Sequence, residues 1–302
     1  MSLDPDIAAI IDELNAGFPK VESMTADQAR AAIRARLRLP ADPEPVDNVT
    51  EDAVAGPAGA VPVRIYTPSA HNESTVVVFA HGGGFVFCDL DSHDGLCRSM
   101  ANGLGAMVVS VDYRLAPEHR WPVAAEDVYA VARWAEQLGA RHLIIGGDSA
   151  GGNLAAVTAV MARDRDGPAI AAQVLLYPVI AAEFDTESYA SYGHGYLNTR
   201  DAMAWYWDQY VPTAADRRHP YASPARAELH DLPPAVIVTA GFDPLCSEGD
   251  RYAQSLAAAG VPTVHRCYHS AIHGFMTMPA VGLGARAREQ TWRDVETLLK
   301  RD

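Results

Sequence analysis

The chain has 302 residues, of which 49% are hydrophobic and 21% charged, and its net charge is −14. This length and apolar content predict one large α/β domain with additions. The acidic balance argues against nucleic acid or an anionic membrane surface as a partner, because both attract basic surfaces. Since no signal-peptide pattern or bilayer-length apolar run is visible, we expect a cytoplasmic protein without stable membrane insertion.

The first 45 residues predict two helices ahead of the main sheet. A helix is expected over residues 3–14, where apolar residues follow helical spacing. A second helix is expected from about residue 26 to 39, with a capping box formed by Thr25 and Gln28 and a stop at Pro40. The apolar positions of the first helix are Leu3, Ile7, Ile10, Ile11 and Leu14.

The rest of the chain alternates between predicted strands and predicted helices. Alternation of this kind implies βαβ units and a mostly parallel sheet with helices on its faces. Residues 184–215 interrupt the alternation and are interpreted as an inserted helical element. The expected strands are 49–54 and 61–67, taken as antiparallel, then 75–80, 106–113, 142–145, 172–177, 235–240 and 263–268. The expected helices are 123–138, 153–163, 249–259 and 284–300.

A serine flanked by glycines lies between the strand at 142–145 and the following helix. The pattern Gly147-x-Ser149-x-Gly151 suits a sharp strand-to-helix turn, which requires small neighbours and strains the backbone at the serine. Such a turn exposes the hydroxyl near a helix N-terminus. The pattern alone is short enough to occur by chance, so its meaning depends on its partners.

A serine nucleophile requires an adjacent base, and three histidines lie at or after the last predicted strand. His265 and His269 have strand spacing and are interpreted as strand side chains, with His269 kept as the rival base. His273 follows in a loop at the carboxyl edge of the sheet, where ligands of open parallel sheets bind. We therefore expect His273 to be the base.

The orienting acid is expected at Asp243, directly after the strand at 235–240. Glu248 and Asp250 are its rivals, although both are expected on the next helix. A second interpretation is that Asp243 only caps that helix. Asp148, beside the serine, is expected to order the turn and not to transfer a proton.

Three consecutive glycines, Gly82 to Gly84, follow the buried run at 75–80. Their backbone N–H groups can approach a ligand closely and stabilise an oxyanion. A flexible turn is the simpler alternative. A phosphate-binding loop is disfavoured because the GK[ST] ending is missing.

The four cysteines show no pattern of a metal or redox site. They form neither a CxxC pair nor a close Cys/His set with zinc spacing, and they are interpreted as buried or idle thiols. No metal ligands are therefore predicted. The four are Cys88, Cys97, Cys246 and Cys267.

In combination, these motifs resemble the bacterial hormone-sensitive lipase family of esterases, in its GDSAG branch, within the α/β-hydrolase superfamily. The resemblance implies an α/β-hydrolase fold with a mostly parallel central sheet, helices on both faces and a helical cap. The cap would comprise residues 1–45 and the insertion at about 184–215, and the catalytic core residues 46–302. The motifs are His81-Gly82-Gly83-Gly84, Tyr113-Arg114-Leu115-Ala116-Pro117-Glu118, Gly147-Asp148-Ser149-Ala150-Gly151-Gly152, Asp243-Pro244-Leu245 and His273-Gly274-Phe275.

The resemblance also implies a reaction, the hydrolysis of short- to medium-chain acyl esters without metal or cofactor. Ser149 would be the nucleophile, His273 the base and then the acid, and Asp243 the orienting carboxylate. The family often has a second acid shortly after its DPL motif, whereas Cys246-Ser247-Glu248 follows here. The implied oxyanion donors are the backbone N–H groups of Gly83, Gly84 and Ala150.

The motif at Tyr113–Glu118 and the pair His93-Asp94 are interpreted as structural braces. An apolar substrate pocket is expected beneath the cap, with the alternative that the same residues only pack the cap onto the core. Its expected residues are Leu14, Phe18, Met203, Trp205, Tyr206 and Trp207.

Two alternative functions remain open from the sequence. Some members of the superfamily are ligand receptors that lack the catalytic histidine, but His273 is present here. An amidase or formamidase is the enzymatic runner-up, because amides also form acyl-enzymes. The expected partner is a small-molecule ester, and the chain is expected to be a monomer or a homodimer.

Overall fold

A mostly parallel sheet of eight strands forms the centre of the computed structural model, which describes residues 2–70 and 74–300. The strand order is β1-β2-β4-β3-β5-β6-β7-β8. Only β1 with β2 and β2 with β4 pair antiparallel, so the predicted sheet type is confirmed. The strands are β1 (Asn48–Gly56), β2 (Gly59–Thr67), β3 (Thr75–Ala80), β4 (Met107–Val111), β5 (His142–Asp148), β6 (Ile170–Leu176), β7 (Ala235–Phe242) and β8 (Thr263–Ile272).

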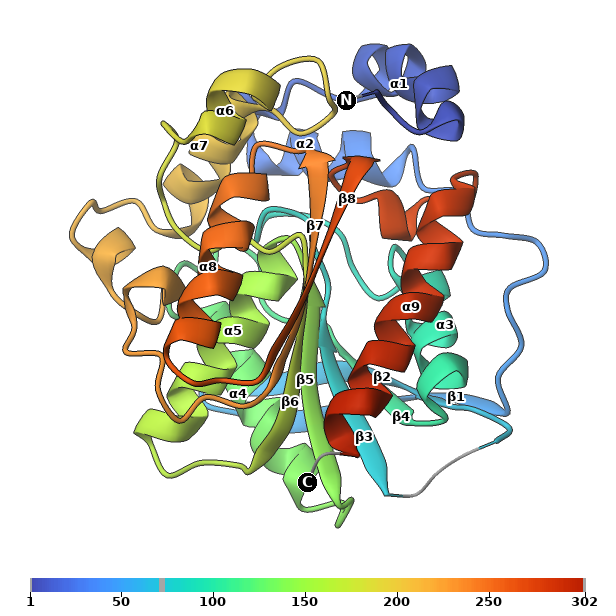
Figure 1. The fold of residues 1–302 in the computed structure, drawn as a ribbon, viewed down its shortest axis with the longest axis vertical. Helices are drawn as coiled ribbons and strands as arrows, with labels where there is room; N and C mark the ends of the chain where they lie inside the picture. The colour runs from blue at the N-terminus through green and yellow to red at the C-terminus, as the bar shows by residue number, and fades with distance from the viewer. Residues whose placement is uncertain (1, 71–73, 301–302) are drawn as a thin grey trace.

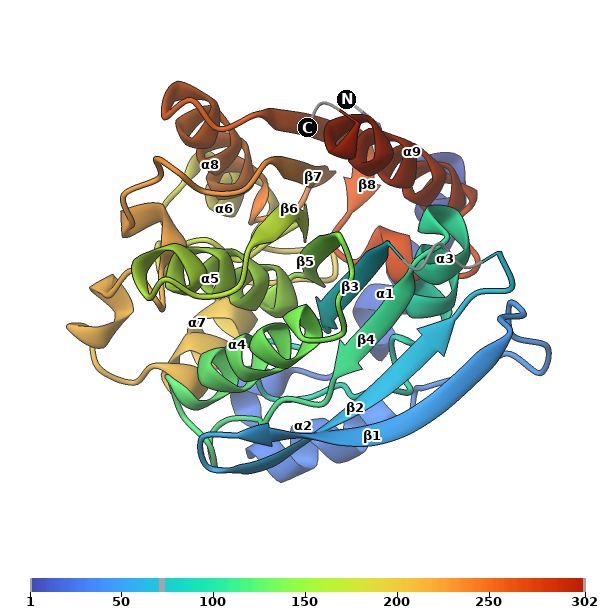
Figure 2. The same ribbon diagram turned by 90° about the horizontal axis from the view of Figure 1, so that it is seen from below.

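Helices cover both faces of the sheet, as Figures 1 and 2 show. One face carries α4 (Val123–Glu136), α5 (Ala150–Asp164) and α8 (Cys246–Ala258). The other face carries α3 (Asp94–Leu104) and α9 (Gly282–Leu299). Because both faces are covered, β3 is buried at every position, as its run of β-branched residues predicts.

Four further helices lie above the carboxyl ends of β7 and β8 (Figure 1). They are α1 (Pro5–Gly17), α2 (Ala26–Arg34), α6 (Glu187–Tyr192) and α7 (Arg200–Tyr210). The side chain of Asn15 on α1 donates to the Gly195 carbonyl at 2.8 Å and accepts from the Leu197 N–H at 2.9 Å. These bonds join the N-terminal helices to the connection between α6 and α7, although about 180 residues separate them in sequence.

The second N-terminal helix begins as predicted but ends early. The capping box between Thr25 and Gln28 is confirmed at the start of α2. The helix ends at Arg34, five residues before the expected boundary, and continues only as turns in which the Arg36 and Leu37 N–H groups bond three residues back. Tighter bonding of this kind commonly finishes a helix whose last residues face solvent.

One helix was not predicted, and several boundaries differ by a few residues from the expected ones. Helix α3 contains two glycines and an asparagine, which lower its helix propensity, but it buries Leu96 and Met100 against its neighbours. Strand β8 continues to Ile272, so His269 lies within it. Helix α8 begins at Cys246, three residues before the expected start.

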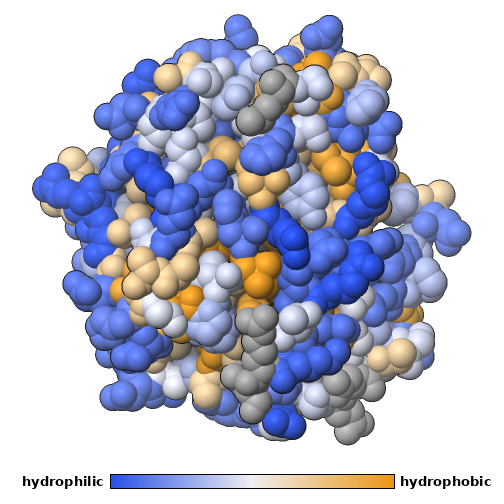
Figure 3. Space-filling model, in the orientation of Figure 1, coloured by the Kyte–Doolittle hydropathy of each residue, from blue (hydrophilic) through white to orange (hydrophobic). Residues whose placement is uncertain are grey.

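Two apolar layers, one on each side of the sheet, form the core. The molecular surface seen in Figure 3 is mostly hydrophilic, with apolar colour in small patches. This agrees with the large negative charge of the chain. Across residues 2–70 and 74–300, we find no helix whose length and hydropathy would suit a bilayer span.

Candidate active site

Ser149 occupies a strained turn between β5 and α5. Its backbone has φ 54° and ψ −118°, a conformation that L-residues rarely adopt. Any side chain at Gly147 would collide with the Gly151 carbonyl, and any at Gly151 with the Ala80 carbonyl. The two glycines are therefore required by the close approach of β5, α5 and β3. Ser149 is buried at the carboxyl edge of the sheet, with 8% of the residue's surface exposed.

His273 and Asp243 form a hydrogen-bonded chain with this serine. His273 Nε2 lies 2.9 Å from Ser149 Oγ, and His273 Nδ1 lies 2.6 Å from Asp243 Oδ2. Asp243 follows β7 and His273 follows β8, so adjacent parallel strands deliver the two groups to one edge. The arrangement gives the serine a base and the base an orienting carboxylate.

The carboxylate of Asp243 serves two neighbours at once. Its Oδ1 accepts the Leu245 N–H at 3.0 Å, which orders the turn into α8, while Oδ2 faces His273. The sequence left two interpretations open, that Asp243 caps the next helix or that it orients His273. Each describes the contact of a different oxygen of this carboxylate. Asp243 is fully buried, and this burial shields its interaction with the imidazole from water.

The rival acids and the rival base lie elsewhere. Glu248 accepts the Ile180 N–H at 2.6 Å, and Asp250 pairs with His265 at 3.0 Å. His269 is exposed, with Nδ1 3.3 Å from the thiol of Cys267. None of these three groups is placed at the Ser149 hydroxyl by the hydrogen bonds of the described residues.

The electrostatics of His273 follow from burial and from one charge. Burial alone would lower the pKa of His273, because it disfavours the imidazolium. The charge of Asp243 and its hydrogen bond outweigh burial and raise the pKa above its ordinary value. The imidazole is therefore a stronger base than it would be without the carboxylate.

The glycine loop after β3 has the backbone conformation of an anion-binding turn. Gly83 has φ 119° and Gly84 φ 60°, and both values favour glycine. Within residues 2–70 and 74–300, neither the Gly83 N–H nor the Gly84 N–H donates a hydrogen bond to another protein group. A side chain at Gly84 would meet the ring of Tyr206 on α7, so the loop is pressed against the upper helices.

Asp148 connects this loop to the serine turn, which is more than the sequence predicted for it. Its Oδ1 accepts the Gly82 N–H at 2.7 Å and lies 3.0 Å from His93 Nε2. Burial would raise the pKa of Asp148, but the His93 imidazole and the Gly82 N–H hold it below its ordinary value. His93 was expected to be a structural brace, and its contact is with Asp148, the residue before the candidate nucleophile.

The motif at Tyr113–Glu118 holds the outer side of the same loop. The Tyr113 hydroxyl donates to the His81 carbonyl at 2.7 Å. Arg30 of α2 donates to the Val86 carbonyl at 2.8 Å, to the Ala116 carbonyl at 2.7 Å and to Glu118 at 2.5 Å. The glycine loop is therefore held from both the core and the N-terminal helices.

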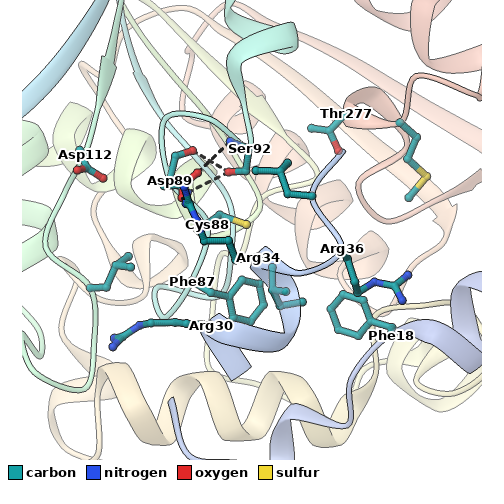
Figure 4. A pocket seen from close by; sticks show the side chains of 14 residues that line it. Phe18, Arg30, Arg34, Arg36, Phe87, Cys88, Asp89, Ser92, Asp112 and Thr277 are labelled. Atoms are coloured by element: carbon teal, nitrogen blue, oxygen red, sulfur yellow. Dashed lines mark hydrogen bonds and ion pairs between the residues drawn. The ribbon is translucent and has the colours of Figure 1, made fainter. Parts of the chain in front are cut away.

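A cavity of about 550 Å³ opens between the N-terminal helices and the loops of the site (Figure 4). Phe18 and Ile33 contribute from the N-terminal segment, Phe87 and Cys88 from the glycine loop, and Met278 from the chain after His273. Ser149, Asp243 and His273 are not part of the lining, so the cavity is not centred on the serine. Its volume suits a small ligand, and its lining combines these apolar side chains with charged ones that include Arg34 and Asp89.

The six residues expected to line a substrate pocket occupy different environments. Phe18 lines the cavity. Met203, Tyr206 and Trp207 are buried in the core layer, where Tyr206 packs edge-on against Phe87 at 5.6 Å between ring centres. Trp205 is partly buried against the same layer, and Leu14 against the opposite one.

Comparison with known proteins places these features in a family. Residues 77–277 match the family described as having the alpha/beta hydrolase fold. Esterase LipI of Mycobacterium tuberculosis is 40% identical over 311 residues, covering 98% of this chain and 94% of that protein. The ethyl acetate hydrolase of Pseudomonas putida is 35% identical over 301 residues, covering 93% of this chain and 94% of that protein.

A solved structure agrees over nearly the whole length. The hyperthermophilic esterase of Pyrobaculum calidifontis has a TM-score of 0.90 and 38% identity, and the match covers 99% of each chain. The resemblance drawn from the motifs is thereby confirmed at the level of the family. The chain belongs to the α/β hydrolases, in the hormone-sensitive lipase family of esterases.

Proposed function

We propose that this chain is a serine carboxylesterase that acts through an acyl-enzyme on Ser149. The observation that carries the proposal is the continuous chain from Ser149 Oγ through His273 to Asp243, with contacts of 2.9 and 2.6 Å. Relatives named as esterases and as an ethyl acetate hydrolase support ester hydrolysis as the reaction.

In the first half of the reaction, Ser149 Oγ attacks the ester carbonyl while His273 Nε2 accepts the serine proton. The oxyanion of the tetrahedral intermediate binds the N–H groups of Gly83, Gly84 and Ala150. The imidazolium then protonates the leaving alcohol, and the acyl group remains on the serine. Each oxyanion donor of this type contributes about 2.7–4 kcal/mol to transition-state stabilisation.

In the second half, water attacks the acyl-enzyme and His273 again accepts the proton. Collapse of the second intermediate releases the carboxylic acid and returns the proton to Ser149. Asp243 keeps Nδ1 protonated throughout, so that Nε2 is available as the acceptor. The fixed contacts of Asp148 with Gly82 and His93 keep the oxyanion loop and the serine turn in register.

The helices above the site act as a cap in this proposal. The cap consists of residues 1–45 and the insertion at about 184–215, and the core of residues 46–302. The cavity beside Phe18 and Phe87 accepts the acyl or alcohol group, and its volume of about 550 Å³ suits short- to medium-chain esters. Met203, Tyr206 and Trp207 support the cavity by packing the cap on the core and do not line it.

The test is covalent labelling combined with kinetics. A fluorophosphonate should label wild type at Ser149, identified by peptide mass, and Ser149→Ala should lose both the label and p-nitrophenyl ester hydrolysis while keeping its circular dichroism spectrum. A folded wild type that neither takes up the label at Ser149 nor hydrolyses the ester would instead indicate a binding protein. A matched ester and amide pair of the same acyl group separates an esterase from an amidase, and faster amide cleavage would contradict the proposal.

A further inference from the structure

Two thiols and a carboxylate meet on the surface beside the candidate active site, and the reaction uses none of them. Cys246 is the first residue of α8, Asp250 lies one turn later, and Cys267 lies on β8. Their donor atoms all lie within 4.8 Å of one another, and Cys246 Sγ is 3.7 Å from Asp250 Oδ2. All three side chains are half-buried, so the cluster is accessible from solvent.

The carboxylate is oriented by neighbours on its far side. Asp250 Oδ1 accepts the Thr239 hydroxyl at 2.8 Å and lies 3.0 Å from His265 Nε2. Oδ2 is left to face the thiol of Cys246. Hydrogen bonds of this kind orient the ligands of protein metal sites.

A histidine stands beside the second thiol. His269 is two residues after Cys267 on β8, so the two side chains share one face of the strand. His269 Nδ1 lies 3.3 Å from Cys267 Sγ, and the ring is exposed. His269 is not among the residues whose donor atoms all lie within 4.8 Å of one another, so its exposed ring would have to turn to bring a nitrogen to an ion in the cluster.

The distances suit a tetrahedral thiophilic ion. With bonds of about 2.3 Å to sulfur and about 2.0 Å to oxygen or nitrogen, sulfur lies roughly 3.5 Å from an oxygen or nitrogen ligand on the same zinc ion. The corresponding separations here are 3.7 Å from Cys246 to Asp250 and 3.3 Å from Cys267 to His269. We propose that Cys246, Asp250 and Cys267, with His269 completing the set, bind a divalent cation of the zinc class.

The position of this site gives it a structural role. Cys246 follows Asp243 by three residues, and His269 precedes His273 by four. A bound ion would cross-link the start of α8 to the end of β8, and so fix the segments that carry the acid and the base. The ion takes no part in ester hydrolysis, and the site does not depend on the proposed function.

The experiment uses the full-length protein, reduced and freed of metal, and titrated with Co²⁺ as the spectroscopic probe. We expect one equivalent to produce thiolate-to-cobalt charge-transfer absorption together with the intense visible bands of tetrahedral cobalt. Zn²⁺ should displace the cobalt and raise the thermal midpoint. Cys246→Ser and Cys267→Ser should lose the charge-transfer bands, and His265→Gln should weaken binding by about 10- to 100-fold.

Cys97→Ala is the matched control, because Cys97 is a buried thiol outside the cluster. It should bind cobalt as wild type does. Three results would overturn the proposal: no thiolate band in reduced wild type, the same band in both serine variants, or a disulfide between Cys246 and Cys267 with no metal uptake after reduction. The wild-type titration decides the matter even if a variant fails to fold.

Discussion

Replacing Asp243 by asparagine tests whether its two carboxylate oxygens have separate roles, one ordering the turn into α8 and the other orienting His273. In wild type, Oδ1 accepts the Leu245 N–H and Oδ2 accepts the His273 Nδ1–H. Asparagine keeps one oxygen only. If that oxygen stays with Leu245, the new NH₂ group faces Nδ1 and donates to it, which moves the imidazole proton to Nε2. His273 then presents a donor to Ser149 where an acceptor is required.

The expected loss follows from this tautomer change. A wrongly protonated histidine in a serine triad lowers kcat by about 10⁴, equivalent to roughly 5.4 kcal/mol of transition-state stabilisation. A second effect concerns pH. In the proposed mechanism neutral His273 is the active form, and Asp243 is the group that raises its pKa against the effect of burial. The acid limb of the residual activity should therefore move to lower pH in Asp243→Asn.

The assay is p-nitrophenyl ester hydrolysis across pH, with thermal unfolding to show that the variant is folded. Glu248→Gln is the matched control, because Glu248 is a buried acid nearby whose Oε1 contact with Ile180 a glutamine can keep. Its rate at neutral pH should stay close to that of wild type. A larger loss in Glu248→Gln than in Asp243→Asn, or an acid limb that does not move, would refute the reasoning.

Three other predictions follow from burial and packing. Gly151→Ala should lower the free energy of unfolding in urea by about 3 kcal/mol or more, because the new Cβ would collide with the Ala80 carbonyl. Gly95→Ala, where a Cβ meets open space, should instead raise it by roughly 0.5–1 kcal/mol. Equal effects of the two variants would contradict the packing argument. Burial raises the pKa of Glu248 to about 8 from 4.5, so between these values the folded protein keeps a proton that the unfolded chain loses, and stability declines as pH rises through the interval. Glu248→Gln should show a flatter decline of stability over the same range in urea unfolding. Phe18→Ala should change the acyl-chain-length profile while Trp205→Ala leaves it unchanged, and the reverse pattern would place the pocket under α7.

The sequence predicts most of this sheet because its strands are short apolar runs separated by clear breaks. Placing Ser149, Asp243 and His273 each directly after a parallel strand was enough to expect them at one edge, since parallel strands end together. The structure brings these three side chains within hydrogen-bonding distance of one another. Their catalytic roles remain predictions until the variants are measured.

What the sequence could not predict depends on contacts between distant segments. Helix α3 has weak propensity and is stabilised by what it buries. The contact of His93 with Asp148 joins residues 55 positions apart. The sequence shows a short motif around each residue but nothing that pairs the two. Cys246 and Cys267 were interpreted as idle because their spacing matches no local metal motif, yet the pairing of β7 with β8 places Cys267 within 4.8 Å of Cys246 and Asp250.

In the proposed mechanism, the bonds of Arg30 would make the N-terminal helices a support of the oxyanion loop as well as a cap over the site. Arg30 donates to the Val86 carbonyl, two residues beyond Gly84, and to the Ala116 carbonyl. Deleting residues 1–45 to open the site would therefore also release the far end of the oxyanion loop. A truncated enzyme should bind bulkier esters yet turn each one over more slowly, so a broader substrate range obtained in this way would be coupled to a lower rate of acylation.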